Sequence, residues 1–282
     1  MKALIYRMGG LGDSLLVYPV IEILKKKGYK VTVWGNPEYF RLAQIAGYCD
    51  TAIFYQPGEN FDLKIFFTKN KEFFEQDKNS VFVDPVVQEK IWIVKHYLKS
   101  LKFENEIFSQ TLTLGFSEQK CANLCIIHPG SGSKRKNPEI NFFYEAEKII
   151  KSYGFNTLYL IGPAEKEFSK FFKNSVYFQD PVEIAKTILK ASLYIGSDSG
   201  VSHLSSYLGV PSIVIFGPTD PSVWHPVGEK LWILRNNSCP PCFPDVCPER
   251  RCLQKDYLIT ELRQILKNLG YRHYLNDSFN YP

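Results

Sequence analysis

Runs of apolar residues of strand length alternate with segments whose apolar residues recur at helical spacing along most of the 282-residue chain. When strands and helices alternate along a chain, each helix usually connects two parallel strands by a right-handed crossover. The pattern therefore predicts an α/β fold with doubly wound parallel sheets. The predicted strands are Ala3–Met8, Lys30–Trp34, Thr51–Tyr55, Ser80–Val83, Leu124–His128, Asn156–Ile161, Ser192–Ile195 and Pro211–Phe216. The predicted helices are Leu15–Lys27, Glu38–Ala46, Gln88–Leu101, Asn141–Ser152, Ala164–Phe172, Val182–Lys190, Val201–Leu208 and Leu258–Leu269.

The alternation is interrupted at Ser109–Lys120, a polar stretch that carries Gly115 and precedes a fresh apolar strand. We therefore expect two domains, residues 1–118 and residues 119–282, with the C-terminal helix returning towards the first domain. Two doubly wound domains leave a cleft between the carboxyl ends of their strands, which is where such sheets bind ligands.

The first strand-to-helix turn contains Gly9, Gly10 and Gly12, followed at once by Asp13. Nucleotide-binding folds hold a phosphate at such a turn, but a carboxylate there would repel it. The spacing G-x-G-x-x-G also fails, because Leu15 stands where the third glycine is required. This turn is therefore not predicted to bind a pyrophosphate.

The stretch IIHPGSGSKRKNPE ends a predicted strand with small residues and continues with three cations. Small residues allow backbone N–H groups to approach an anion, and the cations neutralise it. Taken alone, the stretch is better explained as a solvated basic loop.

A second anion site is predicted at the tight turn Ser197–Gly200, which precedes a helix. The N-terminus of a helix attracts negative charge, and His203 lies in the first turn of this helix. The alternative interpretation makes Asp198 the N-cap of the helix and His203 an ordinary helix histidine.

The composition is that of a soluble globular protein, with 45% hydrophobic and 22% charged residues. No apolar run approaches the ~18 residues of a membrane span, and no signal peptide is recognised, so we expect a cytoplasmic protein. The net charge of +5 without a basic motif does not favour nucleic acid, whereas an anionic substrate or lipid surface would suit it.

Three segments resemble, in order and separation, the signature regions of glycosyltransferase family 9, the bacterial ADP-heptose:lipopolysaccharide heptosyltransferases. They are GGLGDSLLVYPVIEILKKKG, HPGSGSKRKNP and GSDSGVSHLSSYLGVPSIVIFGPTDP, and the last is the most specific. The resemblance covers most of the chain. It implies the GT-B fold, in which an acceptor-binding and a nucleotide-sugar-binding Rossmann-like domain face a central cleft. It also implies an inverting enzyme that moves heptose from ADP-heptose to the lipopolysaccharide inner core.

The resemblance makes Asp13 the candidate catalytic base, with Gly10 and Gly12 beside the acceptor. An inverting transfer needs a base to take the proton of the acceptor hydroxyl as its oxygen attacks the anomeric carbon. The leaving nucleotide diphosphate needs positive charge and N–H donors on the other side of the sugar. The family needs no bound metal for the diphosphate, so no catalytic cofactor is expected.

The remaining donor residues are also implied by the resemblance. A lysine precedes Trp-Pro in the family, whereas this chain reads Lys136–Asn137–Pro138, so the choice between Lys134 and Lys136 stays open and Lys136 is favoured. For the ribose, Glu165 is favoured over Glu167, although both could be ordinary residues of a first helical turn. The full set implied for the donor is Ser131, Gly132, Ser133, Lys136, Glu165, Asp198, Ser199, Gly200 and His203.

Four of the seven cysteines form the cluster CPPCFPDVCPERRC, with Cys239, Cys242, Cys247 and Cys252 spaced C-x₂-C-x₄-C-x₄-C. An odd total with a late cluster is not a secreted disulfide framework. Four close cytosolic thiols suit a structural zinc, although the later spacings are not those of a common zinc finger. Structural zinc, disulfides and free thiols remain as alternatives.

Between Phe61 and Phe108 the chain is rich in aromatic residues and lysines. Aromatic residues at helical spacing usually belong to a core, but the lysines also suit a phosphorylated, lipid-linked saccharide acceptor and peripheral contact with the inner membrane. The sequence does not identify the nucleotide sugar, the acceptor hydroxyl or the oligomeric state. A transferase using another nucleotide sugar, a nucleotide-sugar epimerase and a catalytically silent binding module are the alternative functions.

Overall fold

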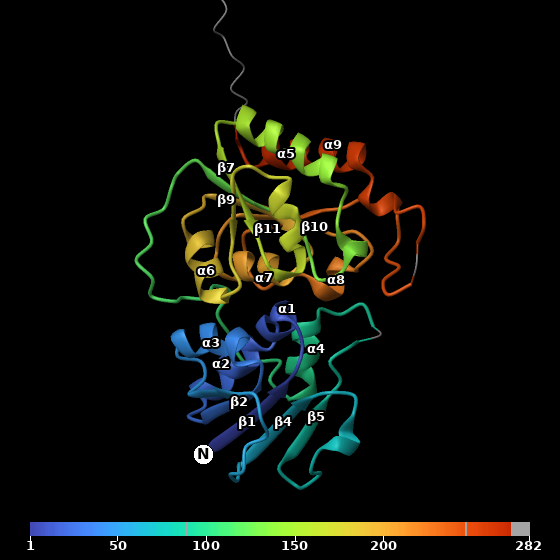
Figure 1. Cartoon of the computed structure of the whole chain (residues 1–282). Coiled ribbons are helices and arrows are strands. Elements are labelled where there is room, and N and C mark those ends of the chain that lie inside the picture. Colours follow the sequence, from blue (N-terminus) through green and yellow to red (C-terminus); the bar gives the residue numbers. More distant parts are fainter. Residues whose placement is uncertain (88, 246, 272–282) are drawn as a thin grey trace, which may run out of the picture.

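The computed structural model describes residues 1–87, 89–245 and 247–271, which form two parallel β-sheets, one in each half of the chain (Figure 1). The first sheet has the strand order β3-β2-β1-β4-β5. Its strands are β1 (Lys2–Arg7), β2 (Lys30–Gly35), β3 (Thr51–Ile53), β4 (Leu63–Phe67) and β5 (Ser80–Val83).

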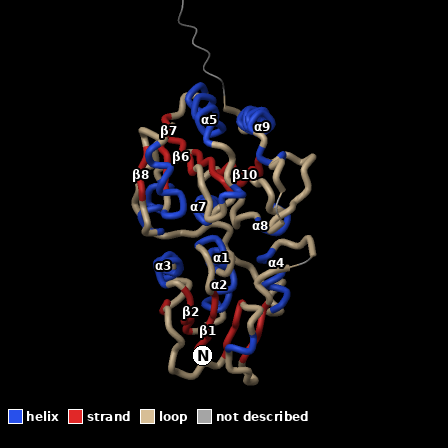
Figure 2. The backbone as a smooth tube through the Cα atoms, turned by 45° about the vertical axis from the view of Figure 1, so that its right-hand side comes forward, coloured by secondary structure: helices blue, strands red, loops and turns tan. Residues whose placement is uncertain are grey.

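All four α-helices of the first domain lie on the same face of this sheet, between the sheet and the second domain (Figure 2). Ile5, Val33 and Phe67 point to this face and pack in one hydrophobic cluster with residues of every helix. The other face carries aromatic side chains that contact one another, among them Tyr6 and Trp34. The helices are α1 (Leu11–Leu15), α2 (Tyr18–Lys26), α3 (Pro37–Ile45) and α4 (Ile93–Ser100).

The second sheet has the order β11-β10-β9-β6-β7-β8 and is covered on both faces. Its central strand β6 shows why its sequence is continuously apolar: Cys125 and Ile127 pack towards α5 and α9, whereas Ile126 packs in the cluster that contains α6 and α7. The strands are β6 (Leu124–His128), β7 (Asn156–Ile161), β8 (Ser175–Tyr177), β9 (Leu193–Ser197), β10 (Ser212–Ile215) and β11 (Leu231–Leu234). The helices are α5 (Ile140–Ser152), α6 (Pro181–Leu189), α7 (Gly200–Tyr207), α8 (Pro221–Trp224) and α9 (Lys255–Asn268), with the 3₁₀ turns η1 (Lys71–Phe73), η2 (Lys134–Lys136), η3 (Pro163–Lys170) and η4 (Arg251–Leu253).

The two domains touch where the N-terminus of α1 meets the N-terminus of α7. A Cβ added at Gly200 would lie 2.8 Å from the backbone nitrogen of Gly12, so only glycine fits there. To one side, Trp92 donates to the carbonyl of His225 (2.9 Å) and stacks on its ring. The junction is therefore a packed contact.

The stretch between α4 and β6 connects the domains without forming a helix or strand. It is tied to the first domain by the buried Glu22, which accepts from the N–H (2.9 Å) and the hydroxyl (2.8 Å) of Ser109. The predicted boundary at residue 118 lies within this stretch.

The sequence pattern missed the strands β4, β8 and β11, which are short or carry polar residues. The first helix begins at Leu11 instead of Leu15 and is interrupted before Pro19, whose ring cannot continue a helix from the preceding turn. The predicted helix at 164–172 is the 3₁₀ turn η3. The helix predicted from Gln88 begins at Ile93, and Gln88 itself lies outside the described residues.

The sequence analysis predicted that the C-terminal helix returns towards the first domain, and this prediction is wrong. α9 packs on α5 at the end of the second domain that is remote from the first domain, because Leu258 and Leu262 bury against the second sheet (Figure 1). Residues 272–282 lie outside the described part of the chain. No helix among the described residues is long and apolar enough to cross a membrane.

Candidate functional site

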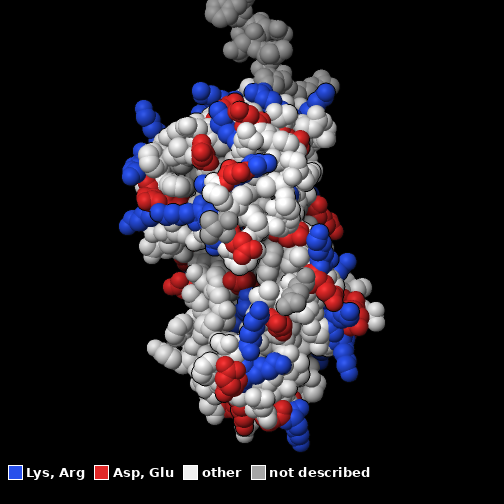
Figure 3. All heavy atoms as spheres, turned by 90° about the vertical axis from the view of Figure 1, so that its right-hand side faces the viewer, with Lys and Arg blue, Asp and Glu red and all other residues white. Residues whose placement is uncertain are grey.

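A cavity of about 1350 Å³ lies between the domains, at the junction of α1 and α7. Residues of the first strand-to-helix turn line one side, and the two predicted anion-binding turns of the second domain line the other. The surface in Figure 3 carries basic and acidic side chains side by side on both lobes, and no large patch of one sign stands out. The chemistry of the cavity therefore depends on individual side chains.

Asp13 is held at the first-domain side of the cavity by two donors. Arg7 donates to its Oδ1 (2.7 Å) and the backbone N–H of Gly10 donates to its Oδ2 (3.0 Å). The Asp13 side chain remains 41% exposed, whereas Arg7 is buried. Gly9 must lack a side chain, because a Cβ there would lie 2.8 Å from the Cβ of Asp13. The site thus contains a fixed, accessible carboxylate.

Arg7 was missed by the sequence analysis. It ends β1 directly before the glycines, so a cation at the carboxyl end of a strand was the available signal. Its Nε has no hydrogen-bond partner among the described residues, so the guanidinium is committed to Asp13 through Nη2. This cation keeps Asp13 in one orientation.

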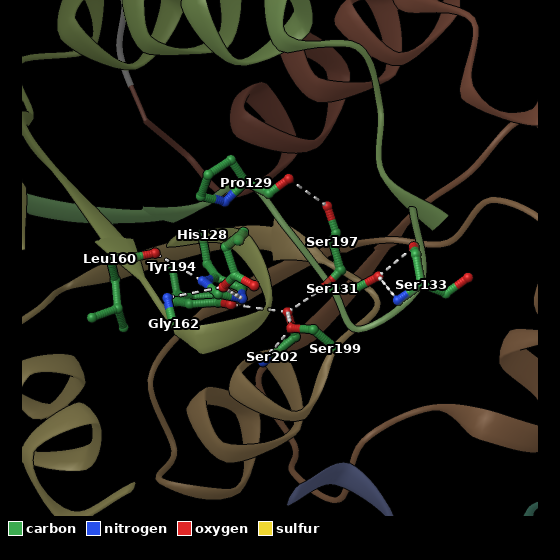
Figure 4. Close-up of polar contacts among 11 residues, drawn as sticks. His128, Pro129, Ser131, Ser133, Leu160, Gly162, Tyr194, Ser197, Ser199 and Ser202 are labelled. Atoms are coloured by element: carbon green, nitrogen blue, oxygen red, sulfur yellow. Dashed lines mark hydrogen bonds and ion pairs between the residues drawn. The ribbon is translucent and has the colours of Figure 1, made fainter. Parts of the chain in front are cut away.

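The structure separates the two candidate lysines of the basic loop. Lys136 is 21% exposed, lines the cavity and forms an ion pair with Asp198 (Nζ to Oδ2, 2.8 Å). Lys134 is 88% exposed, does not line the cavity and contacts the exposed Glu167 (3.6 Å). In the same loop, Ser131 accepts from the N–H of Ser133 (3.3 Å) and donates to its carbonyl (2.9 Å), which folds the loop into a tight turn (Figure 4).

The second turn is built around Ser199, which caps α7 by accepting from the N–H of Ser202 (3.3 Å). The interpretation of Asp198 as the N-cap is therefore wrong. Asp198 is buried and accepts instead from Lys136 and from the hydroxyl of Thr219 (2.6 Å), a cavity residue that the sequence analysis missed. Ser202 donates to the carbonyl of Ser197 (2.6 Å) and fixes the turn from below (Figure 4).

His203 lines the cavity one helical turn into α7. Its Nε2 lies 4.0 Å from Oδ1 of Asp198, and its buried Nδ1 has no partner among the described residues. Burial lowers the pKa of His203 to about 4 against the opposing effect of the Asp198 carboxylate. The ring is therefore neutral at physiological pH.

Glu165 and Glu167 are also distinguished by their surroundings. Glu165 is buried, lines the cavity and accepts at Oε1 from the N–H of Gly162 (3.0 Å), whereas the Glu167 side chain is 55% exposed. The Nε2 of His128 lies 3.0 Å from the same Oε1 (Figure 4 shows His128, Leu160 and Gly162 around this point). The favoured ribose candidate is thus inside the cavity.

The cysteine-rich loop forms a further wall of the cavity. Phe243 lines the cavity and lies against the cations of Arg135 (5.0 Å) and Lys136 (5.3 Å), both cation–π contacts. Burial, followed by the neighbouring thiols of Cys239, Cys242 and Cys247, raises the pKa of Cys252 to about 11. No group of three or more His, Cys, Asp or Glu in the described chain is arranged to hold a metal, and its cysteines are free thiols. The predicted structural zinc is therefore not assembled in this structure and stays a prediction.

Comparison with known proteins confirms the resemblance in the second domain. Residues 182–253 match glycosyltransferase family 9 (heptosyltransferase). Lipooligosaccharide heptosyltransferase 2 of Campylobacter jejuni is 33% identical over 93 residues, which is 30% of this chain. The matched segment spans 29% of the length of that relative. The family match at residues 182–253 contains the turn before α7 and the cysteine-rich loop.

Solved structures match the whole fold. ADP-heptose LPS heptosyltransferase II of E. coli superposes with a TM-score of 0.71 at 13% identity, covering 96% of this chain and 100% of that chain. E. coli heptosyltransferase WaaC with ADP gives 0.70 at 15% identity, covering 95% and 99%. A family 9 glycosyl transferase from Veillonella parvula gives 0.72 at 14% identity, covering 95% and 96%. The predicted GT-B architecture of two parallel-sheet α/β domains is thereby confirmed.

The depressed pKa of His203 predicts a pH-dependent stability. Because the folded-state value of about 4 lies below the ordinary 6.5, the unfolded chain binds a proton that the folded chain does not, and stability falls as the pH is lowered through this window. Between about pH 7 and about pH 4.5, His203 should contribute a loss of roughly 2–3 kcal/mol in the free energy of unfolding. Urea denaturation at both pH values should show a smaller loss for His203→Gln than for the wild type. The partly exposed His96 provides the control, because His96→Gln should lose as much free energy of unfolding between the two pH values as the wild type. If His203→Gln also loses as much as the wild type, His203 is not the source of the pH dependence.

Proposed function

We propose that this chain is an inverting glycosyltransferase that moves a heptose from ADP-heptose to a hydroxyl of the lipopolysaccharide inner core. One observation carries the proposal: a fixed, accessible carboxylate, Asp13, and a cationic turn with a helix N-terminus, Lys136 and Gly200, line the same cavity from opposite domains. This is the arrangement that a displacement at an anomeric carbon requires, with a base on one side and a site for the leaving anion on the other. The family 9 match and the fold of the heptosyltransferases agree with it.

Asp13 is the base in this proposal. The acceptor hydroxyl gives its proton to Asp13 while its oxygen forms a bond to the anomeric carbon, and the bond from that carbon to the phosphate oxygen breaks with its electron pair going to the phosphate. Arg7 and the N–H of Gly10 orient the carboxylate, and proton transfer should accompany attack. Gly10 and Gly12, which line the cavity, leave room for the acceptor.

The diphosphate binds at the second-domain side. Lys136 supplies a positive charge, the small residues 131–133 allow backbone approach, and the N-terminus of α7 supplies N–H groups from Gly200 onward. Neutral His203 lines the cavity beside this turn without adding a charge. Glu165 accepts hydrogen bonds from the ribose. WaaC, which has this fold, was solved with ADP.

The acceptor is proposed to be a lipid-linked anionic saccharide at the cytoplasmic face of the inner membrane. Lys69 and Lys90 line the cavity from the first domain and suit its negative charge. Phe54, Tyr55 and Phe73 are exposed on the same domain, where aromatic side chains suit transient contact with a lipid surface.

Replacing the proposed base Asp13 should greatly lower turnover but should not change the affinity for the donor. Asp13→Asn should lower turnover with ADP-heptose by roughly 10²–10⁴-fold, with donor affinity nearly unchanged. Turnover and calorimetric donor binding measure the two effects. Glu38→Gln, a change of another carboxylate that lines the cavity from the first domain, serves as the matched control. Wild-type turnover in a folded Asp13→Asn protein would remove Asp13 from the mechanism.

The two lysines of the basic loop provide an internal comparison for the diphosphate site. Lys136→Ala should weaken the binding of ADP and ADP-heptose by about 10–100-fold, because a charge-assisted contact to phosphate is lost, and should barely change adenosine binding. Lys134→Ala should bind ADP like the wild type, because its side chain points to solvent. A larger loss from Lys134→Ala, or an equal loss for adenosine, would refute this placement.

The cysteine-rich loop carries the remaining prediction, a structural zinc that is independent of catalysis. Native mass spectrometry of protein purified under reducing conditions should find one zinc per chain if the thiolates of Cys239, Cys242, Cys247 and Cys252 all ligate it, because four thiolates satisfy a tetrahedral ion. Chelators should then remove the zinc without disturbing the diphosphate contacts of Lys136. Metal-free protein with four titratable thiols in the loop would show that these cysteines are free.

A further inference from the structure

The end of β6 and the turn η3 bring together a buried pair, His128 and Glu165, whose side chains are 1% and 4% exposed. We infer that His128 is a positioning residue: a doubly protonated ring that holds Glu165 so that the carboxylate recognises the ribose hydroxyls of the donor nucleotide. This inference rests on the proposed function, whose sequence motifs gave no role to His128.

Both ring nitrogens of His128 face oxygen atoms. Nδ1 lies 2.8 Å from the carbonyl oxygen of Leu160, which can only accept, so Nδ1 carries a proton. Nε2 lies 3.0 Å from Oε1 of Glu165. A neutral ring would point a lone pair at that carboxylate, so the geometry requires one further proton between Nε2 and Oε1.

This further proton belongs to the ring and not to the carboxyl group. Oε1 of Glu165 also accepts from the backbone N–H of Gly162 (3.0 Å). A donor of this kind favours the ionised form of a carboxylate. The buried group is therefore an imidazolium next to a carboxylate, and its net charge is zero.

The surrounding backbone fixes this pair in one place. His128 ends β6 and Leu160 lies near the end of the adjacent strand β7, so the sheet sets the position of the ring. A Cβ at Gly130 would lie 2.6 Å from the Cβ of Glu165, so this glycine is what allows the loop to close over Glu165. The position of Glu165 in η3 therefore depends on the absence of a side chain at Gly130.

The arrangement leaves one carboxylate oxygen for a ligand. Among the described residues, the contacts of the Glu165 carboxylate to Gly162 and His128 both go to Oε1, and Glu165 lines the cavity. Oε2 is available to accept from a hydroxyl donor such as a ribose. The charge of His128 also offsets that of Glu165, so the carboxylate does not repel a diphosphate bound in the same cavity.

The binding test compares ADP with 2′,3′-dideoxy-ADP, which lacks the ribose hydroxyls. Wild-type protein should prefer ADP by about 10–100-fold, the range for hydrogen bonds to a charged group. His128→Gln and Glu165→Gln should each reduce this preference to a few-fold, and the double variant should show no further reduction, because His128 acts through Glu165. Lys136→Ala is the matched control, since it should weaken both nucleotides and retain the preference. A folded His128→Gln protein that retains the wild-type preference would overturn the inference.

Ring ¹⁵N chemical shifts test the pair without any ligand, with the signals of His128 assigned by their loss in His128→Gln. At about pH 7.5 both nitrogens should be protonated in the wild type, and Glu165→Gln should leave one of them unprotonated, because a buried ring without an anionic partner does not retain the charge. A singly protonated ring in the wild type would refute the pair as described. If ADP does not bind to the wild type at all, the proposed function fails, and the shifts still decide the state of the pair.

Discussion

The close approach of α1 and α7 is the constraint on which the site depends. Each helix begins at a glycine-containing turn, and the lack of a side chain at Gly12 and Gly200 allows their backbones to meet. Through this contact a carboxylate in the first domain comes to lie beside the anion-binding turn in the second. Each turn alone resembles an ordinary strand-to-helix connection, so the chemistry arises only from their juxtaposition.

The electrostatics of the cavity follow from how each charge is partnered. Asp13 is accessible and held by Arg7, Lys136 is held by Asp198, and Glu165 is held by His128. Each of these three charges has a partner of opposite sign, so none of them is an isolated charge in the ligand-free cavity. In the proposed function, a diphosphate would change the partners of Lys136 without requiring bulk solvent to reorganise around an isolated charge.

The sequence pattern predicted the α/β class, the central strands and the turns of the site, because these depend on local periodicity and on glycines at fixed positions. It did not predict β4, where a lysine interrupts the apolar run, or β11, which is apolar but only four residues long. Arg7, His128 and Thr219 were missed for a different reason. Each contacts a partner from another segment of the chain or from across a turn, so neither the motifs that contain His128 and Thr219 nor the strand end at Arg7 indicates the contact by itself.

One hydrophobic cluster runs from the first sheet through α1, α2 and α7 into the second sheet, and it includes Val17, Tyr18 and Tyr207 at the junction. Wide separation of the domains would expose this apolar surface to water at about 25 cal/mol per Å². This shared apolar surface therefore favours the arrangement in which the two turns lie against each other. A donor that meets a site already assembled retains its intrinsic affinity, because little of its interaction energy is diverted to shifting a population of domain orientations.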